Sequence, residues 1–323
     1  MLEITPEQLY QRFCNKEIDK LTLINSLLLL IEESTDEVYR IGAINQLRRL
    51  GIKSDHLFTI MENLMISDTN DKIRNAAARY ISYLYFEKSY NIVNWAIQYE
   101  ESYDCILTMI NTIKKMQKKE SKRLLISEIH KILKSSKIPT EKPYIFQKYK
   151  KRIKEVFKRK DIEDFTVNEL AEILINYKTV SLLALTYPNF YFDLDISNGL
   201  ISEVDLADYL QFEVKGTPFG WKNNIISLEK IKGLNNLKFV KKLDLSNNLI
   251  EDLTELTTFK NLESLFLANN KISDPKNVKY LNNLPKIRYI DLTGNKIAKL
   301  VSRNDFKPSV KVVLKRFDEQ FQF

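Results

Sequence analysis

The sequence predicts an α+β protein built as a two-part solenoid, in which an all-helical superhelix precedes a coil of short parallel strands. Three observations support this prediction. Capped helical segments follow one another through residues 5–133, a helical pattern recurs there after about 34 residues, and a strand-like pattern occurs four times between residues 219 and 297. A chain of 323 residues is longer than one core usually holds, which favours two domains or an elongated array.

The strand-like pattern is apolar-x-apolar-x-x-Asn-x-Ile. Its copies begin at residues 219, 243, 265 and 290, so the spacings are 24, 22 and 25 residues. In each copy the two apolar residues share one face of a short strand, and the residues beside them take the other face. We expect the Asn to turn inward and satisfy backbone groups left unpaired where the chain leaves the strand. The copies are Phe219-Trp221-Asn224-Ile226, Leu243-Leu245-Asn248-Ile250, Leu265-Leu267-Asn270-Ile272 and Ile290-Leu292-Asn295-Ile297.

This pattern resembles the leucine-rich repeat of the 22-residue class. The resemblance implies parallel strands along the inner wall of a curved coil, and roles such as a regulatory subunit or an assembly adaptor. We interpret Leu194-x-Ile196-x-x-Gly199-x-Ile201 as a degenerate copy in which Gly199 replaces the Asn. Residues 310–314 are interpreted as a closing strand, since a terminal repeat must cover its last apolar edge.

Residues 1–160 are predicted to form an α-solenoid. Helices are expected to start at Thr5-Pro6 and then to occupy 18–31, 36–50, 54–66, 71–86, 89–99, 102–116 and 121–133, each beginning at or near a capping residue. Ala43 and Ala77 recur in matching positions, and residues 71–77 resemble the second helix of a HEAT-type repeat. Because a short amphipathic helix pair cannot bury its apolar face alone, the pairs must stack.

Residues 161–193 are predicted to form a helical and aromatic junction, and residues 194–323 a leucine-rich-repeat domain with a C-terminal cap. Thr166 and Glu169 form a capping box that opens a helix to about residue 177. The aromatic residues between 187 and 192 are expected to cover the end of the first coil.

The positive charge is concentrated in one segment. The chain has a net charge of +8, but residues 111–160 hold 18 Lys and Arg against 4 acidic residues, so the remainder is negative. Residues 146–160 are interpreted as an amphipathic helix with a solvated basic face. The alternative is that this face contacts an acidic protein, nucleic acid or an anionic membrane. Its candidate contacts are Lys150, Lys151, Arg152, Lys154, Lys158 and Arg159.

The strand alternation predicts which side chains face the concave wall and bind a protein partner. Phe266 is the most informative, because it stands between two core leucines where its ring must leave the core. We interpret it as an interaction anchor inside a polar rim, although a lone surface Phe is also common. The predicted partner-binding residues are Lys242, Asp244, Ser246, Ser264, Phe266, Tyr289, Asp291 and Thr293.

Catalysis, cofactors and metals find little support in the sequence. The 7 glycines form no phosphate-binding loop, and Cys14 and Cys105 belong to no zinc-binding motif. His56 and His130 lie in separate predicted helices without a nucleophile pattern. A site within residues 161–218 is the least favoured alternative. We therefore expect a non-enzymatic scaffold or adaptor.

The predicted subcellular location is the cytoplasm. The first residues lack the basic and then apolar pattern of a secretory signal. No apolar run approaches the ~20 residues that span a bilayer.

Overall fold

The computed structural model describes residues 4–135, 143–187, 191–208 and 223–315. It divides into two compact units, Met1–Ser127 with Thr166–Ala171, and Glu128–Phe165 with Glu172–Phe323. The sequence placed the first boundary at residue 160, whereas the contacts assign residues 128–160 to the second unit. Each unit is described by itself below.

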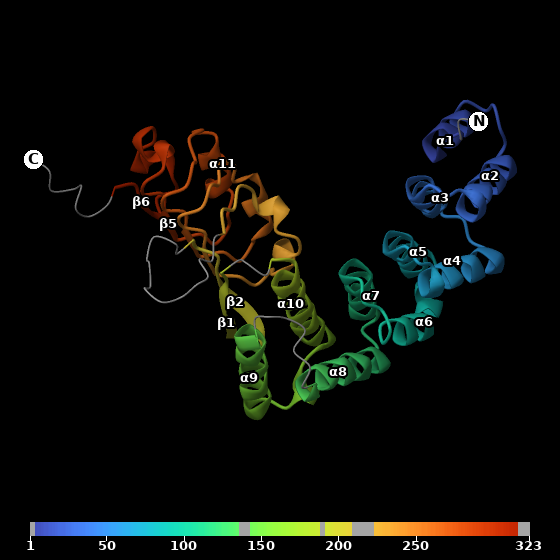
Figure 1. The fold of residues 1–323 in the computed structure, drawn as a ribbon, viewed down its shortest axis with the longest axis horizontal. Helices are drawn as coiled ribbons and strands as arrows, with labels where there is room; N and C mark the ends of the chain where they lie inside the picture. The colour runs from blue at the N-terminus through green and yellow to red at the C-terminus, as the bar shows by residue number, and fades with distance from the viewer. Residues whose placement is uncertain (1–3, 136–142, 188–190, 209–222, 316–323) are drawn as a thin grey trace, which may run out of the picture. The chain divides into compact units, whose positions relative to one another are not determined.

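Helices in the first unit form two layers (Figure 1). One layer holds α1 (Pro6–Cys14), α3 (Glu37–Arg49), α5 (Asp71–Leu84) and α7 (Tyr103–Met116), packed side by side in that order. The other holds α2 (Lys20–Glu33), α4 (Asp55–Ser67) and α6 (Ser89–Ala96), which pack against the first layer. Helix α8 (Lys119–Lys134) follows. The predicted all-helical array is confirmed.

Local sequence explains where these helices begin. The Thr5 hydroxyl accepts a hydrogen bond from the Gln8 N–H, and the Gln8 side chain accepts one from the Thr5 N–H. Asp36 and Asn70, 34 positions apart, cap α3 and α5, because each side chain accepts a hydrogen bond from the N–H two residues further on. Ala43 and Ala77 are fully buried in α3 and α5, where small side chains let neighbouring helices approach closely.

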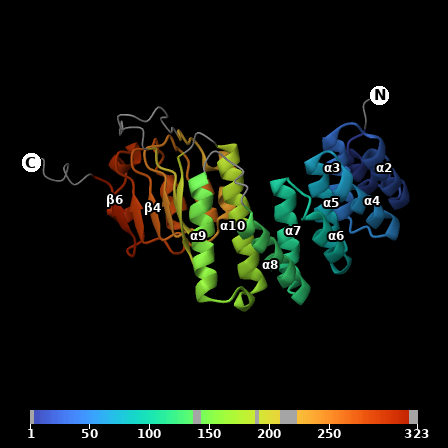
Figure 2. The same cartoon turned by 60° about the horizontal axis from the view of Figure 1, so that its bottom comes forward.

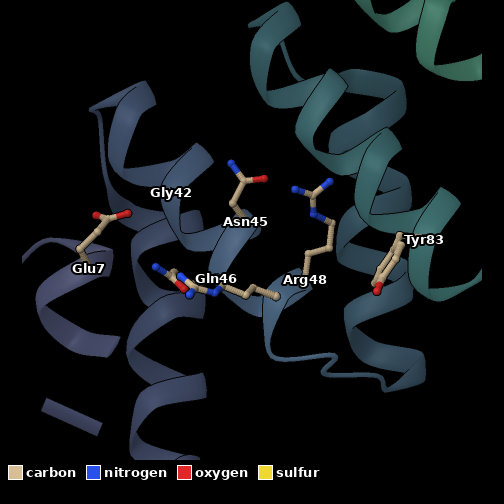
Figure 3. Close-up of a pocket in the computed structure, with 7 residues that line it drawn as sticks. Glu7, Gly42, Asn45, Gln46, Arg48 and Tyr83 are labelled. Carbon is tan, nitrogen blue, oxygen red and sulfur yellow. The ribbon is translucent and has the colours of Figure 1, made fainter. Parts of the chain in front are cut away.

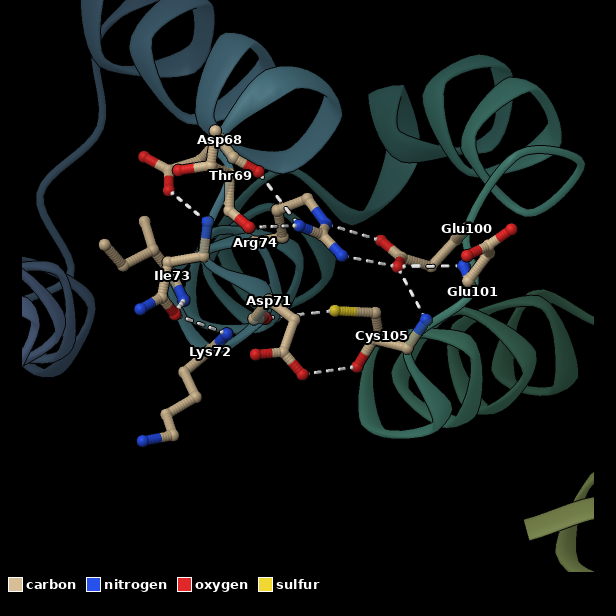
Figure 4. Close-up of polar contacts among 11 residues, drawn as sticks. Asp68, Thr69, Asp71, Lys72, Ile73, Arg74, Glu100, Glu101 and Cys105 are labelled. Carbon is tan, nitrogen blue, oxygen red and sulfur yellow. Dashed lines mark hydrogen bonds and ion pairs between the residues drawn. The ribbon is translucent and has the colours of Figure 1, made fainter. Parts of the chain in front are cut away.

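A series of arginine–carboxylate pairs ties successive helix pairs together. The Arg40 guanidinium lies 2.7 Å from an Asp68 carboxylate oxygen and also donates to the Ile31 carbonyl. One repeat later, Arg74 donates to both carboxylate oxygens of Glu100, at 2.9 and 2.8 Å, and to the Asp68 carbonyl (Figure 4). Asp68 thus contacts both arginines. Bidentate geometry and near-complete burial of Glu100 make the second pair a strong one.

Burial would raise the pKa of Glu100, but hydrogen bonds from Arg74 and from the Ser102 N–H outweigh it and lower that pKa below 4.5. The carboxylate is therefore charged at neutral pH, as the ion pair requires.

Two helices stand at the start of the second unit, α9 (Pro143–Arg159) and α10 (Val167–Thr186), and they lie side by side in Figure 2. The Tyr149 hydroxyl donates to the Ile173 carbonyl at 2.9 Å, and the Phe146 ring meets the Tyr177 ring edge-on. Ile153 is also buried on this side of α9. The predicted amphipathic packing is confirmed, but its partners are α10 and the adjoining sheet.

The sheet of the second unit has six strands in sequence order: β1 (Asp193–Ser197), β2 (Leu200–Asp205), β3 (Lys242–Asp244), β4 (Ser264–Phe266), β5 (Tyr289–Asp291) and β6 (Lys311–Val313). Strands β2 to β6 are parallel. The return segments include a 3₁₀ helix at Thr254–Thr258 and the short helix α11 (Asn277–Asn282). The predicted closing strand is β6.

Buried asparagines connect each repeat to its neighbours. Asn270 donates through Nδ2 to the carbonyls of Leu245 and Leu267, at 2.9 and 3.0 Å, and its Oδ1 accepts from the Ile250 N–H at 3.0 Å. Asn248 and Asn295 make the same set of bonds one repeat earlier and one repeat later. The predicted inward turn of the Asn is confirmed. Each amide bonds to backbone N–H and carbonyl groups where the chain leaves the strand and the strand hydrogen bonds end.

The interpretation of residues 194–201 as a degenerate repeat is wrong. Strands β1 and β2 are antiparallel, and Ser197 pairs with Leu200 across a two-residue turn. Asn198 and Gly199 in that turn have φ values of 52° and 84°, which suits a tight hairpin. The hairpin replaces a parallel repeat at this end of the sheet.

The predicted register of the first repeat is also wrong. Phe219 and Trp221 lie outside the described residues, but Ile226 is 53% exposed whereas Ile225 is buried. The Ile225 N–H donates to Asn248 Oδ1, which is the bond that Ile250 and Ile272 make in later repeats. Asn223 takes the buried Asn position in place of Asn224.

Strand β2 therefore supplies the first repeat. Val204 pairs with Leu243, which places Leu206 at the position of Leu245. In later repeats the Asn follows three residues after that leucine, whereas here Asn223 follows Leu206 after seventeen. The first repeat thus carries an insertion between its strand and its buried Asn.

Candidate functional site

One face of the parallel sheet carries side chains that are not needed for the core. Leu243, Leu265 and Ile290 on β3, β4 and β5 are buried, so their neighbours point to the opposite side, which we call the open face. Strand register aligns these neighbours in two rows. The first row is Glu203, Lys242, Ser264, Tyr289 and Lys311, and the second is Asp205, Asp244, Phe266, Asp291 and Val313.

The structure places the predicted partner-binding residues on or beside this face. Asp244, Phe266 and Asp291 stand in register on adjacent strands and are half-buried. Ser246 and Ser264 are half-buried too, whereas Lys242 is exposed. Thr293 is only 6% exposed, so it offers little surface to a partner.

An aromatic pair forms the centre of the open face. The ring centroids of Phe266 and Tyr289 lie 5.1 Å apart at an interplanar angle of 41°. The Lys242 Nζ is 5.8 Å from the Phe266 centroid, and the Lys311 Nζ is 5.9 Å from the Tyr289 centroid. Contacts of this kind hold the rings and the ammonium groups in fixed places, at about 0.5–1 kcal/mol each for exposed cations. The result is an apolar patch flanked by lysines.

Carboxylates border the aromatic pair along the second row. One oxygen of Asp244 accepts the Ser246 N–H, and one oxygen of Asp291 accepts the Thr293 N–H, both at 2.9 Å. These local bonds occupy one oxygen of each carboxylate and restrict its direction. Partial burial, and then the charge of Asp291, raise the pKa of Tyr289, so its phenol stays protonated and can donate a hydrogen bond.

Four members of the open face were missing from the sequence prediction. Glu203 and Asp205 were overlooked because the first strand was assigned to residues 219–221. Lys311 and Val313 were overlooked because the alternation was not continued into the closing strand. Glu203 lies 3.2 Å from Lys242. Extending the alternation through residues 310–314 finds Lys311 directly.

The basic residues of α9 are mostly exposed. Lys150 is half-buried and its Nζ donates to the Ser135 carbonyl, and burial, then the charge of Lys154, lower its pKa. Arg152 lies within 3.5 Å of both Glu155 and Asp195. On α9, four exposed cations have no ion-pair partner in the described part of the chain. They are Lys151, Lys154, Lys158 and Arg159.

The two histidines weighed for catalysis lie on different helices. His56 on α4 and His130 on α8 are both exposed. Within the described ranges no group of His, Cys, Asp or Glu side chains has an arrangement that could hold a metal ion. None of the helices described is long and apolar enough to cross a membrane.

Comparison with known families agrees with this geometry. Residues 260–307 match the family model described as leucine-rich repeats in two copies. The match includes β4, α11 and β5, and hence the Phe266–Tyr289 pair. A comparison with curated proteins found no match. The C-terminal part of the chain is a leucine-rich-repeat array, a class of structure that generally serves as a non-enzymatic surface for protein binding.

Proposed function

We propose that this protein is a non-enzymatic scaffold or adaptor, acting in the cytoplasm, which binds a protein partner on the open face of its leucine-rich repeats. The observation that carries the proposal is the aromatic pair of Phe266 and Tyr289 at the centre of a face whose other members are, apart from Val313, charged or hydroxyl-bearing. Leu265 and Ile290 are buried in the core, whereas both rings are on the opposite side of the sheet and are only half-buried.

The chemistry of the face suits a partner with an apolar side chain beside a basic one. The apolar group would cover the two rings, and aromatic anchors at the centre of an interface commonly supply most of its binding energy. A Lys or Arg of the partner would meet the half-buried carboxylates of Asp244 and Asp291. Lys242 and Lys311 at the edge would favour an acidic group there.

Alanine substitution of the aromatic pair tests the proposal. Partners captured by the wild-type protein from its native cells should be lost with Phe266→Ala, since removing a central aromatic anchor typically costs about 2 kcal/mol or more, roughly thirtyfold in Kd. The melting temperature should fall by only a few degrees, because the aromatic contact itself contributes about 0.5–1.5 kcal/mol.

Phe239→Ala is the matched control, because Phe239 is 37% exposed in the same unit but belongs to neither row of the open face. If the Phe266→Ala variant captures the same set of proteins as the Phe239→Ala variant, the proposal is contradicted. Unfolding of the Phe266→Ala variant would show instead that the ring belongs to the core.

Binding of nucleic acid or another anionic surface is a second candidate function. It is favoured by the exposed, unpaired cations on α9 described above, which lie on the side opposite the buried Phe146 and Tyr149. Filter binding of a single-stranded oligonucleotide across a salt series provides the test. Affinity should fall steeply with salt, by a slope of about 0.7 per phosphate contacted, and charge reversal at Lys154 and Lys158 should reduce that slope. Absence of binding at low salt would remove this candidate.

A further inference from the structure

The layer formed by α3, α5 and α7 carries a groove. This groove contains no residue of the open face. Two hollows, of about 600 and 340 Å³, share Arg48 and Tyr83 in their walls, so they adjoin. Figure 3 shows the first hollow with Asn45 and Arg48 on one side and Tyr83 on the other. The Tyr83 ring is 72% exposed at the junction of the two hollows.

The groove has an excess of unpaired positive charge. Arg48 on α3, Arg79 on α5 and Lys115 on α7 line it, one from each successive helix. None of the three forms an ion pair within the described ranges, although Glu7 and Asp104 line the same hollows. Surface ion pairs contribute little to stability, and these unpaired cations remain available to attract an acidic ligand.

A second feature at the groove suggests that the ligand carries a hydrogen-bond donor. Gln46 lines the first hollow and is only 7% exposed. Its Oε1 has no hydrogen-bond partner among the residues described. A buried amide oxygen without a donor is uncommon, and an extended peptide brings N–H donors that are free of internal hydrogen bonds.

We propose that this groove binds an extended acidic peptide segment whose carboxylates recur at about every third residue. Neighbouring helices in one layer lie about 8–10 Å apart, so side chains at matching heights on α3, α5 and α7 recur at about that interval. A polyproline II segment advances about 3.1 Å per residue with three residues per turn, which places every third side chain on one side at about the same interval. Tyr83 would pack against an apolar or proline side chain between the acids.

A nucleic acid fits this groove less well than a peptide. Glu7 and Asp104 would repel a continuous line of phosphates, whereas a peptide can place uncharged residues beside them. The groove belongs to the first unit, so the proposal does not depend on the function proposed for the leucine-rich repeats.

Fluorescence anisotropy with the full-length protein tests the proposal. The probe is a labelled peptide with Glu at every third position, separated by Pro and Ser. The reference is a peptide of the same composition with its Glu residues clustered at one end. Arg79→Glu should weaken binding of the spaced peptide by roughly tenfold, since it replaces an attraction with a repulsion. Lys53→Glu, an equal charge change at an exposed site that lines neither hollow, should leave binding unchanged.

Four outcomes would overturn the proposal. In the first, the spaced peptide does not bind, and in the second, the clustered peptide binds as tightly as the spaced one. In the third, Lys53→Glu and Arg79→Glu weaken binding of the spaced peptide equally. In the fourth, a single-stranded oligonucleotide binds more tightly than the spaced peptide at the same salt concentration. Circular dichroism of both variants shows whether the helices are intact. Because Arg79 is exposed and forms no ion pair, its substitution should leave them so.

Discussion

Substitution of Asn270 by Leu should destabilise the leucine-rich-repeat unit by about 1–3 kcal/mol. The contacts of Asn270 determine this magnitude. The carbonyls of Leu245 and Leu267 each retain a second donor when Asn270 is lost, Asn248 Nδ2 at 3.1 Å and Asn295 Nδ2 at 2.7 Å. Only the Ile250 N–H loses its partner, so the cost is that of one buried unsatisfied group.

Hydrogen–deuterium exchange at single-residue resolution is the appropriate assay, because global unfolding of a chain with two units is not a single transition. The Ile250 amide should exchange faster in Asn270→Leu, while amides in α3 and α5 remain unchanged. An unfolding free energy within about 0.5 kcal/mol of wild type, with Ile250 still protected, would refute the reasoning.

Asn270→Asp provides a comparison of similar size. It keeps an acceptor for Ile250 but places a carboxylate oxygen against the two carbonyls, so burial should raise the pKa of the introduced acid. If the pKa is higher in the folded state than in the unfolded chain, ionisation of the acid lowers the stability of the folded state. This loss of stability is complete above the folded-state pKa and diminishes as the pH falls towards the pKa of the unfolded chain. The variant should therefore become more stable relative to wild type in mild acid. A pH-independent difference would contradict this account.

Three further predictions concern individual residues. The pKa of Glu100 is lowered in the folded state, so its contribution to stability is present above 4.5 and is lost as the pH falls through the lowered value; Glu100→Gln should remove that part of the pH dependence in urea titrations. Gly294→Ala should destabilise by about 1–3 kcal/mol, because φ is +74° and the new Cβ would lie 2.1 Å from Asn269 Oδ1; adding Asn269→Ala should recover part of the loss in melting temperature. Mass spectrometry after alkylation should show Cys14 modified and Cys105 protected until unfolding, since Cys105 is buried and burial raises the pKa of its thiol to about 12.

Much of the fold could be predicted because the relevant signals are local. Alternation within β3 to β5 and the Asn after each strand determined which side chains enter the core. The first repeat was missed because Asn223-Asn224 and Ile225-Ile226 are doublets, which permit two registers. The bond from the Ile225 N–H to Asn248 in the next repeat, together with the burial of Ile225 and Asn223, distinguishes them.

The hairpin could have been predicted from the sequence. Asn198-Gly199 between two alternating segments is the usual signal for a two-residue turn, but the match of Gly199 to the repeat pattern concealed it. By contrast, Arg40–Asp68 and Arg74–Glu100 join residues 28 and 26 positions apart, and no local pattern identifies which carboxylate each arginine meets. The groove on α3, α5 and α7 depends on three helices and is visible only once they are packed.

The sharing of carbonyls between successive asparagines has a consequence for engineering. Leu245 and Leu267 each serve two amides from adjacent units, so every unit carries a carbonyl for the Asn of the next unit and an Asn for the carbonyl of the previous one. A duplicated 22-residue module spliced in after Ile272 should therefore be accepted and lengthen the array. The antiparallel hairpin at one end and β6 at the other would stay untouched, because neither is part of that internal joint.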